Sequence, residues 1–593
     1  MEGLRNRNHA VGDRAALGVA DSVGRSHDLL DEAAELAEHA VDDVCVHVFE
    51  TRKVADAFHV CDVAQDEADV GQRCPVVTHG SQNTVGAAHC PLWDRRTYPG
   101  SMPSYTPRMN TFPPVGAHLI AGDWVTEGAA GTGVSLNPAR PDEPVGDYPI
   151  GDAGTASDAV GAAVEARSSW RSLPFGARAR ILEQAARLFD ERADDLALLC
   201  TLEEGKTLAE SRGEATLAAE TFRYQAAIAK MSSERIFPNN VPGETIRTVR
   251  VPLGVVGVVT PWNFPLLIPV WKLAPALATG NTVVWKPASD TPLLSVAIAR
   301  LLADAGLPDG VLNLVLGPGS MGAAMVADER VDGVTFTGSV PVGQQIRDVV
   351  TARNGRVQLE LGGHNPCIVF DDADLDLAVA GAVGGAMGAT GQKCTATRRV
   401  IAVGDIHDEL LERMSVAVEA LRVGDGREDD TEIGPLVSAG ARTEVAEAVD
   451  AALAEGAEAV AVNATAPAGP CYYAPTLFSG TPDLTICRDE VFGPVSTVIR
   501  ADGEDEAFAL ANDTRFGLSA SIFTNDLWRI DRAVHELEAG LVKVNAPTTG
   551  SEIHAPFGGE KNSSGHAARE QGDTALEFFT RTRTAYIRPG TRR

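Results

Sequence analysis

From about residue 115 onward, strand-like and helix-like segments alternate along the chain, and this alternation restricts the fold more than any other feature. Short apolar runs such as "NTVVWKP" (281–287) are typical of buried strands, and longer runs such as "PLLSVAIARLLADAG" (292–306) are typical of helices. Strands separated by helices of this length form a parallel sheet with helices on its faces. The sequence therefore predicts an α/β protein, and a length of 593 residues predicts several domains.

Particular segments give more specific expectations. "HLIAGDWV" (118–125) predicts one short strand, and residues 175–206 follow one long helical pattern. The glycines of "VTFTGSVPVGQQI" lie at a strand-to-helix turn, where Gly343 is expected to open a helix. Backbone N–H groups at such a turn can approach a phosphate through Gly338 and Ser339, although a simple tight turn explains this spacing equally well.

Residues 1–108 differ in composition from the rest, with seven of the thirteen histidines and four of the nine cysteines. The pairs Cys45-x-His47 and His59-x-Cys61 have one-residue spacings, which do not fit the usual zinc knuckle, so we expect no metal site. One amphipathic helix could form at 28–44. We interpret this leader as disordered, or as untranslated if synthesis starts at Met102 or Met109.

The formal net charge of −30 argues against nucleic acid or an anionic membrane as a partner, because both need a basic surface. No apolar run is long enough to span a membrane and no signal peptide is evident, so we predict a cytoplasmic protein. The chain has 8 Lys against 43 Arg, and this acid-rich, lysine-poor composition leads to the hypothesis of adaptation to high salt. The cysteine spacing does not indicate a disulfide framework.

One cysteine stands in an unusual setting, the stretch "GGAMGATGQKCTATRR". Cys394 could be a core thiol, a metal ligand or a nucleophile. No cluster of Cys or His accompanies it, which argues against a metal, and Cys367 lies inside a predicted strand and is better explained as core. Lys393, Arg398 and Arg399 add positive charge nearby.

Three further polar residues follow or end predicted strands. Asn263 offers a neutral amide donor that suits a developing oxyanion, although an Asn in a turn is usually structural. Lys286 ends a strand at the edge where open parallel sheets bind ligands. Glu360 ends another strand 34 residues before Cys394, and it could be a buried ion-pair partner or the base that activates water.

In combination, these motifs resemble the aldehyde dehydrogenase superfamily. The matching stretches occur in the family's order from about 115 to 590: "TPWNFP", "GNTVVWKPAS", "FTGSVPVG", "LELGGHNP", "GQKC", "GPLVS", "EVFGPV", "NDTRFGLSASIFT" and "PFGGEKNSSG". The resemblance implies the aldehyde dehydrogenase fold, with a Rossmann-like cofactor domain, an α/β catalytic domain and a small β oligomerisation domain. It places the cofactor domain at 115–234 and 254–360, the catalytic domain at 361–570, and bridging segments at 235–253 and 571–593.

The resemblance also implies a role for each matching residue. Cys394 would attack the aldehyde carbon, Asn263 and the Cys394 backbone N–H would hold the oxyanion, and Glu360 would activate water to hydrolyse the thioester. The residues implied at the cofactor are Trp262, Lys286, Ser289, Gly338, Ser339, Glu490 and Phe492. Many NAD-preferring relatives carry Glu where Ser289 stands, so we predict that NADP is accepted and preferred over NAD, with Asp290 as an opposing charge.

Within the family, the chain most resembles the 2,5-dioxopentanoate (α-ketoglutarate semialdehyde) dehydrogenases of pentose and sugar-acid catabolism. The alternatives are succinate semialdehyde and a broad specificity for aldehydes. The succinate-semialdehyde branch often has Arg where Trp271 stands, and the absence of that Arg argues against the first alternative and makes Trp271 a candidate substrate residue. Thr548 and Thr549 are candidate substrate contacts, or parts of an ordinary polar loop. Further alternatives are an acylating enzyme, a cofactor-free cysteine hydrolase and a non-catalytic member. The resemblance implies a homodimer or homotetramer. The tail "ALEFFTRTRTAYIRPG" (575–590) is expected to be a strand that, with the bridging segment, pairs across the subunit interface.

Overall fold

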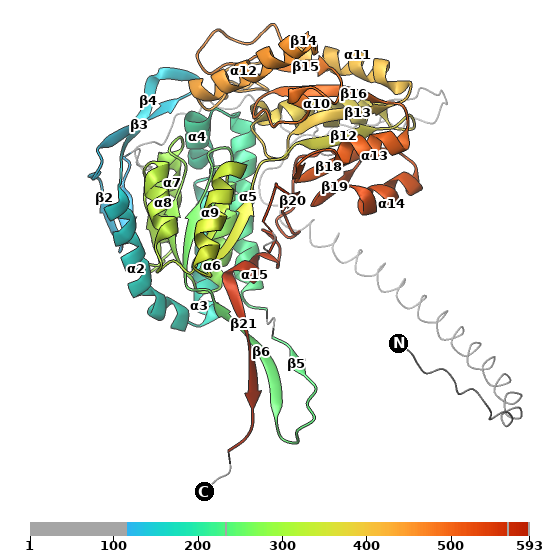
Figure 1. Cartoon of the computed structure of the whole chain (residues 1–593). Coiled ribbons are helices and arrows are strands. Elements are labelled where there is room, and N and C mark those ends of the chain that lie inside the picture. Colours follow the sequence, from blue (N-terminus) through green and yellow to red (C-terminus); the bar gives the residue numbers. More distant parts are fainter. Residues whose placement is uncertain (1–114, 232–233, 566–567, 591–593) are drawn as a thin grey trace, which may run out of the picture. The chain divides into compact units, whose positions relative to one another are not determined.

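A computed structural model describes residues 115–231, 234–565 and 568–590 (Figure 1). These residues belong to one compact unit of the chain. The predictions for residues 1–108, including the helix at 28–44 and the absence of a zinc site, lie outside the described residues.

The first sheet has seven strands in the order β11-β10-β7-β8-β9-β1-β2. β7 to β11 are parallel, whereas β1 and β2 form an antiparallel hairpin at one edge. The bounds are β1 (His118–Ile120), β2 (Asp123–Val125), β7 (Val255–Val259), β8 (Thr282–Lys286), β9 (Leu312–Leu314), β10 (Gly333–Thr337) and β11 (Arg356–Glu360). From β7 the chain proceeds to β8 and β9 on one side and later to β10 and β11 on the other. The gap between the carboxyl ends of β7 and β10 is therefore a topological switch point, where open α/β sheets bind ligands.

Helices cover both faces of this sheet because its strands are apolar on both sides. Val255 packs in a core with one group of helices, and its neighbour Val256 points to the opposite face and packs with another group. The first group is α2 (Ala153–Ser172), α8 (Gly319–Ala327) and α9 (Val340–Ala352). The second group is α3 (Phe175–Glu191), α4 (Ala193–Glu204), α5 (Leu208–Ile228), α6 (Leu267–Ala278) and α7 (Pro292–Asp304).

The second sheet also has seven strands, in the order β14-β15-β16-β13-β12-β18-β19. Only β14 is antiparallel to its neighbour. Its strands are β12 (Asn365–Val369), β13 (Thr397–Val403), β14 (Glu458–Val462), β15 (Thr476–Ser479), β16 (Val495–Ala501), β18 (Ser519–Phe523) and β19 (Leu541–Val544). The accompanying helices are α10 (Leu375–Met387), α11 (Ile406–Glu419), α12 (Ala439–Glu455), α13 (Glu504–Asn512) and α14 (Leu527–Glu536), with short 3₁₀ turns at η1 (Gly388–Gly391) and η2 (Thr485–Cys487).

A third sheet joins the C-terminal tail to an internal segment. β21 (Thr580–Ile587) pairs along its whole length with β6 (Thr245–Pro252), which also pairs with β5 (Ile236–Phe237) (Figure 1). The short helix α15 (Ala575–Phe579) precedes β21, so the tail is not strand throughout. The remaining strands form the hairpin β3 (Thr132–Asn137) with β4 (Arg140–Pro149), and the pair β17 (Phe516–Gly517) with β20 (Glu560–Lys561).

The strands of the three sheets fall within the predicted cofactor, catalytic and bridging ranges, respectively. The division of the chain into those domains stays a prediction. In the described part of the chain, no helix combines the length and apolar character needed to cross a bilayer.

Three local predictions were wrong. Residues 118–125 form a hairpin and not one strand, because Ala121 and Gly122 adopt positive φ angles of 54° and 93° that reverse the chain. The helical pattern at 175–206 breaks at Arg192 into α3 and α4. The helix expected to open at Gly343 begins three residues earlier, after Ser339, where Pro341 fixes a helical φ in the first turn.

Candidate active site

The predicted site residues gather at the carboxyl ends of the parallel strands of the first sheet. Glu360 ends β11, Lys286 ends β8, Gly338 follows β10, and Asn263 lies four residues after β7. The carboxyl ends of parallel strands share one edge of a sheet, so the fold places these four residues along that edge. Cys394 comes from the second half of the chain, three residues before β13.

The loop that carries Cys394 is held next to Asn263. The Asn263 side chain is buried, and its Nδ2 donates a 2.9 Å hydrogen bond to the carbonyl oxygen of Gln392, two residues before Cys394. On the other side, Asn365 Nδ2 donates to the carbonyl oxygens of Cys394 and Ala396, each at 2.8 Å. These bonds fix the thiol loop on both sides of the sulfur.

The chain segment just before Cys394 contains three successive residues whose backbone lies in the left-handed region. Ala389, Thr390 and Gly391 have φ angles of 48°, 55° and 65°. Such angles are costly for non-glycine residues, by about 1–2 kcal/mol each. The conformation is held from outside: Ala389 N–H donates to Glu210 Oε1 at 2.7 Å, and Thr390 Oγ1 donates to the Gly434 carbonyl oxygen at 3.1 Å.

The electrostatic surroundings keep the thiol protonated. Burial, together with the carboxylates of Glu490 and Glu360, raises the pKa of Cys394 to about 12, against the backbone N–H groups of Cys394 and Thr395. The nearby arginines, which the sequence suggested as positive charge around the thiol, bind carbonyl oxygens. Arg398 donates to Gly493 and Gly391, and Arg399 donates to residues including Leu510 and Ala511. Formation of the thiolate therefore needs a base close to Cys394.

Glu360 is a buried carboxylate with an unsatisfied oxygen. Its Oε1 accepts a 3.2 Å hydrogen bond from Ser564 Oγ, whereas Oε2 has no hydrogen-bond partner among the described residues. Burial raises the pKa of Glu360 well above its ordinary value, and the nearby Glu570 raises it further, against the opposing effect of Lys272. The free oxygen can accept a hydrogen bond from a water or a ligand.

Two charged residues behind Glu360 were not predicted. Lys272 on α6 forms an ion pair with Glu570, and its Nζ also donates to Thr335 Oγ1 at 2.9 Å. Both side chains are buried. A sequence signal existed for one of them, because Lys272 interrupts the otherwise apolar helix "LIPVWKLAPALA", where a charge is costly unless it is paired.

Glu490 lies against the two glycines that follow β11. Its Oε1 accepts a 3.0 Å hydrogen bond from the Gly363 N–H, and a Cβ at Gly362 would come within 2.0 Å of Oε2. Burial raises the pKa of Glu490 to about 7, against the charge of Arg398. Two residues on, the Phe492 ring meets the Trp262 ring edge to face, with centroids 5.5 Å apart.

The remaining cofactor residues fit a dinucleotide. The N-terminus of α9 follows Gly338, and its exposed N-cap residue Ser339 makes no side-chain cap, so the first N–H groups of the helix can receive a pyrophosphate. The Lys286 stem packs beside Gly322, and burial lowers the pKa of Lys286 to about 8, against the charge of Asp290. Ser289 Oγ donates to the Gly317 carbonyl oxygen at 3.1 Å.

The predicted substrate residues have different surroundings. The Trp271 ring packs against the Phe557 ring, with centroids 5.2 Å apart, and its Nε1 has no partner among the described residues. Thr548 is fully buried, and its hydroxyl donates to the Thr395 carbonyl oxygen at 2.7 Å, which favours a structural role over a substrate contact. Thr549 is partly exposed, and its carbonyl oxygen accepts from Lys543 Nζ at 2.9 Å.

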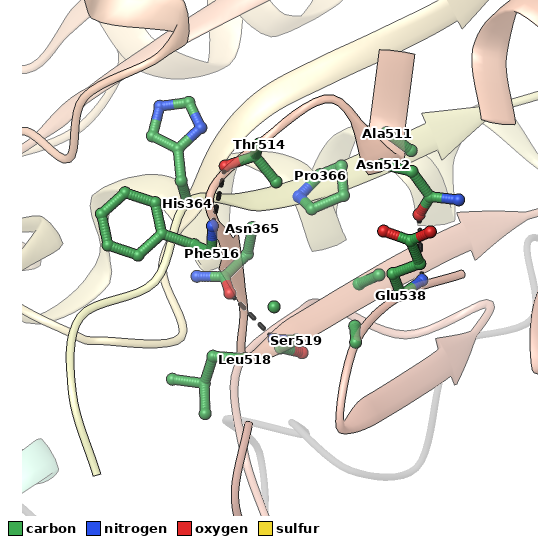
Figure 2. Close-up of a pocket in the computed structure, with 13 residues that line it drawn as sticks. His364, Asn365, Pro366, Ala511, Asn512, Thr514, Phe516, Leu518, Ser519 and Glu538 are labelled. Carbon is green, nitrogen blue, oxygen red and sulfur yellow. Dashed lines mark hydrogen bonds between the residues drawn. The ribbon is translucent and has the colours of Figure 1, made fainter. Parts of the chain in front are cut away.

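A small cavity lies next to the thiol loop, between β12 and β18 (Figure 2). Its volume is about 10 Å³, room for about one water molecule. His364 and Phe516 stack at one side of it, near Asn365, whose side-chain oxygen accepts a 3.0 Å hydrogen bond from the Ser519 N–H. Asn512 and Glu538 lie at the opposite side. The cavity is too small for an organic substrate.

Comparison with known proteins agrees with this geometry. Residues 124–585 match the model of the aldehyde dehydrogenase family, and the chain belongs to that family. It is 44% identical over 476 residues to the alpha-ketoglutarate semialdehyde dehydrogenase of Haloferax volcanii, covering 79% of this chain and 98% of that protein. It is 41% identical over 471 residues to the 2,5-dioxopentanoate dehydrogenase of Saccharolobus solfataricus, with coverage of 79% and 98%.

Solved structures of the same fold include betaine aldehyde dehydrogenase from Staphylococcus aureus in complex with NAD+, with a TM-score of 0.77 and 34% identity over 80% of this chain and 95% of that one. An NADP-dependent enzyme of E. coli has the same TM-score, at 35% identity over 80% and 98% of the two chains. The predicted fold and family are thereby confirmed, and the protein is an aldehyde-oxidising enzyme that uses NAD(P).

Proposed function

We propose that this enzyme oxidises 2,5-dioxopentanoate to 2-oxoglutarate as a step in pentose or sugar-acid catabolism. The observation that carries the proposal is the match at 40–44% identity to three enzymes named for this one semialdehyde, each covered over 98% of its length. Trp271 stands where the succinate-semialdehyde branch often has an arginine, which argues against succinate semialdehyde.

In the proposed mechanism, a water beside Cys394 takes the thiol proton and passes it to bulk solvent, and the sulfur attacks the aldehyde carbon. Asn263 Nδ2 has a second hydrogen besides the one it gives to Gln392, and this hydrogen and the Cys394 backbone N–H would hold the oxyanion. NAD(P), when bound, would supply the hydride acceptor, and loss of hydride from the thiohemiacetal would leave Cys394 acylated as a thioester.

Glu360 would then act as general base. Its unpartnered Oε2 would accept a proton from the water that attacks the thioester, and its raised pKa makes this carboxylate a stronger base than an ordinary one. Lys272 would stabilise the ionised form of Glu360, whereas Glu570, the ion-pair partner of Lys272, opposes its ionisation.

We further propose how the cofactor is held. The N-terminus of α9, with Gly338 and Ser339, would bind the pyrophosphate, and Lys286 and Ser289 the adenosine ribose. Glu490, Phe492 and Trp262 would lie at the nicotinamide ribose. Ser289 is short and neutral and lies three residues after a lysine, which supports a preference for NADP over NAD.

The assembly proposed is a homodimer or homotetramer in the cytoplasm. The tail strand β21 and segment β5–β6 form a sheet of their own, and Ile236 and Tyr586 on it are 78% and 67% exposed. Large apolar side chains on exposed strands favour pairing with another subunit. The excess of acidic residues further supports function in high salt. Light scattering tests the oligomeric state, and activity measurements in low and molar salt test the function in high salt.

A panel of aldehydes assayed with both cofactors tests the main proposal. We expect the highest kcat/KM with 2,5-dioxopentanoate and NADP, and lower values with succinate semialdehyde and betaine aldehyde. A higher kcat/KM with either of those aldehydes would overturn the proposed substrate and leave the family assignment intact.

A further inference from the structure

A buried lysine that is far from Cys394 in the sequence contacts the backbone of the proposed oxyanion donor, Asn263. Lys206 occupies the turn between α4 and α5 and is only 1% exposed. Its ammonium donates to the backbone carbonyl oxygen of Asn263 at 2.5 Å and to Glu214 Oε2 at 2.9 Å. It also lies 4.2 Å from the centroid of the Phe264 ring. Burial opposes the charge on Lys206, but the carboxylates of Glu204 and Glu214 outweigh it and raise the pKa of Lys206.

Glu214 holds the far end of the segment that begins at Asn263. Its Oε1 accepts hydrogen bonds from the N–H groups of Leu266 and Leu267 at 2.8 and 2.9 Å, at the start of α6. The segment from Asn263 to Leu267 is therefore held at its first residue by Lys206 and at its last by Glu214. An ion pair buried at this depth is costly to form, and removal of one partner leaves an unpaired charge.

A second link runs from Lys206 to the thiol loop. The Lys206 backbone N–H donates to Glu204 Oε2 at 2.8 Å, and Glu204 Oε1 accepts from Gln392 Nε2 at 3.5 Å. The Gln392 carbonyl accepts from Asn263 Nδ2, so these contacts form a closed ring. We name Glu204, Lys206, Glu214 and Gln392 the Lys206 cluster. This cluster contacts Asn263 and includes Gln392 of the loop that carries Cys394. The sequence motifs did not indicate that these residues form a cluster.

We propose that Lys206 is a positioning residue that sets the distance between the Asn263 amide and the Cys394 sulfur. The inference rests on the proposed role of Asn263 and extends it. An oxyanion donor must lie about 2.7–3.1 Å from the developing charge. A displacement of about 1 Å in an active site can lower the rate about 100-fold. Lys206 itself would not touch substrate, because it is buried and its ammonium donates to Asn263 and Glu214 and lies 4.0 Å from Glu204 Oε2.

The chain offers a matched control for a purely structural effect. Glu203, next to Glu204 on α4, is also fully buried and also accepts from the first N–H groups of a helix, those of Leu293 and Leu294 at 3.0 and 2.7 Å. It contacts neither Asn263 nor the thiol loop. Glu203→Gln and Glu214→Gln thus change the same kind of contact, and only Glu214→Gln changes the Lys206 cluster.

The test measures kcat, both KM values and thermal unfolding for Lys206→Met, Glu214→Gln and Glu203→Gln in the full chain, with Asn263→Ala as background in a double-mutant cycle. We expect Lys206→Met and Glu214→Gln to lower kcat by about 10–100-fold and to change the KM for the cofactor by less than about twofold. In the Asn263→Ala background, Lys206→Met should lower kcat little further, because the amide donor that Lys206 positions is absent. Glu203→Gln should keep kcat at saturating cofactor.

Equal kcat for Lys206→Met and Glu203→Gln would overturn the inference, as would an equal loss from Lys206→Met with and without Asn263. If Lys206→Met does not fold, the double variant Lys206→Met/Glu214→Gln removes both charges and is read by the same criteria. Wild-type kcat in Asn263→Ala would instead refute the proposed oxyanion role. Slow turnover in Asn263→Ala with normal turnover in Lys206→Met would refute only the positioning role.

Discussion

Asn365 holds the carbonyl oxygen of Cys394 with a 2.8 Å hydrogen bond from Nδ2, and the same nitrogen donates to the Ala396 carbonyl oxygen. The side-chain oxygen of Asn365 accepts from the Ser519 N–H on β18. One buried amide therefore ties the thiol loop to two strands of the second sheet. This amide therefore helps to fix the position of the loop that carries Cys394.

The first prediction concerns this amide. Asn365→Ala leaves two carbonyls and one N–H without partners, so we expect a loss of stability of about 1–3 kcal/mol and a fall in kcat. Asn463→Ala is the control, because Asn463 is another buried amide that donates to three carbonyls, those of Val418, Glu419 and Leu421. Urea unfolding and kcat are measured for both variants. Normal kcat in a folded Asn365→Ala protein would contradict the prediction.

The second prediction separates the two chemical steps. Cys394→Ser should abolish turnover, and Glu360→Gln should accumulate acyl-enzyme because the thioester then lacks its base. Intact mass spectrometry after mixing with aldehyde and cofactor detects the added acyl mass. Cys367→Ser, at a buried cysteine within β12, is the control and should retain turnover. An acyl-enzyme that is no more abundant in Glu360→Gln than in wild type would argue against Glu360 as the base.

The third prediction concerns the backbone at the thiol loop. Gly391→Ala should be strongly destabilising, because the φ angle is 65° and a Cβ would lie 1.9 Å from the Gly493 carbonyl oxygen. Gly404→Ala has nearly the same φ of 68°, but its Cβ would meet nothing within 4 Å. We expect Gly404→Ala to lower the free energy of unfolding by about 1 kcal/mol. Gly391→Ala should lower it clearly more and should also abolish activity. Similar unfolding midpoints for the two variants would show that the contact with Gly493 is unimportant.

The fourth prediction concerns cofactor preference. Ser289→Glu should shift the ratio of kcat/KM values from NADP toward NAD by about tenfold or more, since a carboxylate would repel a 2′-phosphate. Ser289→Gln has a similar size without the charge and is the control. Steady-state kinetics with both cofactors measure the shift. A shift of the same size in Ser289→Gln would assign the effect to side-chain size and not to charge.

The fifth prediction is a pH dependence of stability. Burial raises the pKa of Glu203 to about 7, against the hydrogen bonds from Ser135, Leu294 and Leu293. The folded state thus favours protonated Glu203, so its contribution to stability is fully present below the unfolded pKa of about 4.5 and is lost as the pH rises through about 7. The free energy of unfolding should fall less between pH 5 and 8 in Glu203→Gln than in wild type. Urea titrations at several pH values measure this, and parallel curves would contradict it.

The sequence alone was sufficient for the α/β fold, the family and the order of the motifs. Periodicity located elements such as the buried strand β8 and the helix α7, because apolar faces must be buried in any fold of this chain. It did not locate the turn at Ala121–Gly122 or the break at Arg192, because these depend on single backbone angles. Cys394, Asn263 and Glu360 could be proposed as site residues because they stand in local motifs with fixed spacing.

Contacts between distant segments were decided only by the tertiary structure. Lys206 and Asn263 are 57 residues apart and Lys272 and Glu570 are 298 apart, and no local pattern connects either pair. Thr548 looked like a loop residue in sequence, yet its hydroxyl is used by the thiol loop. The motifs specify which groups can react, because chemistry depends on residue type and spacing. Whether a buried charge is paired, and which groups surround the thiol, depends on packing between elements that the sequence order does not place together.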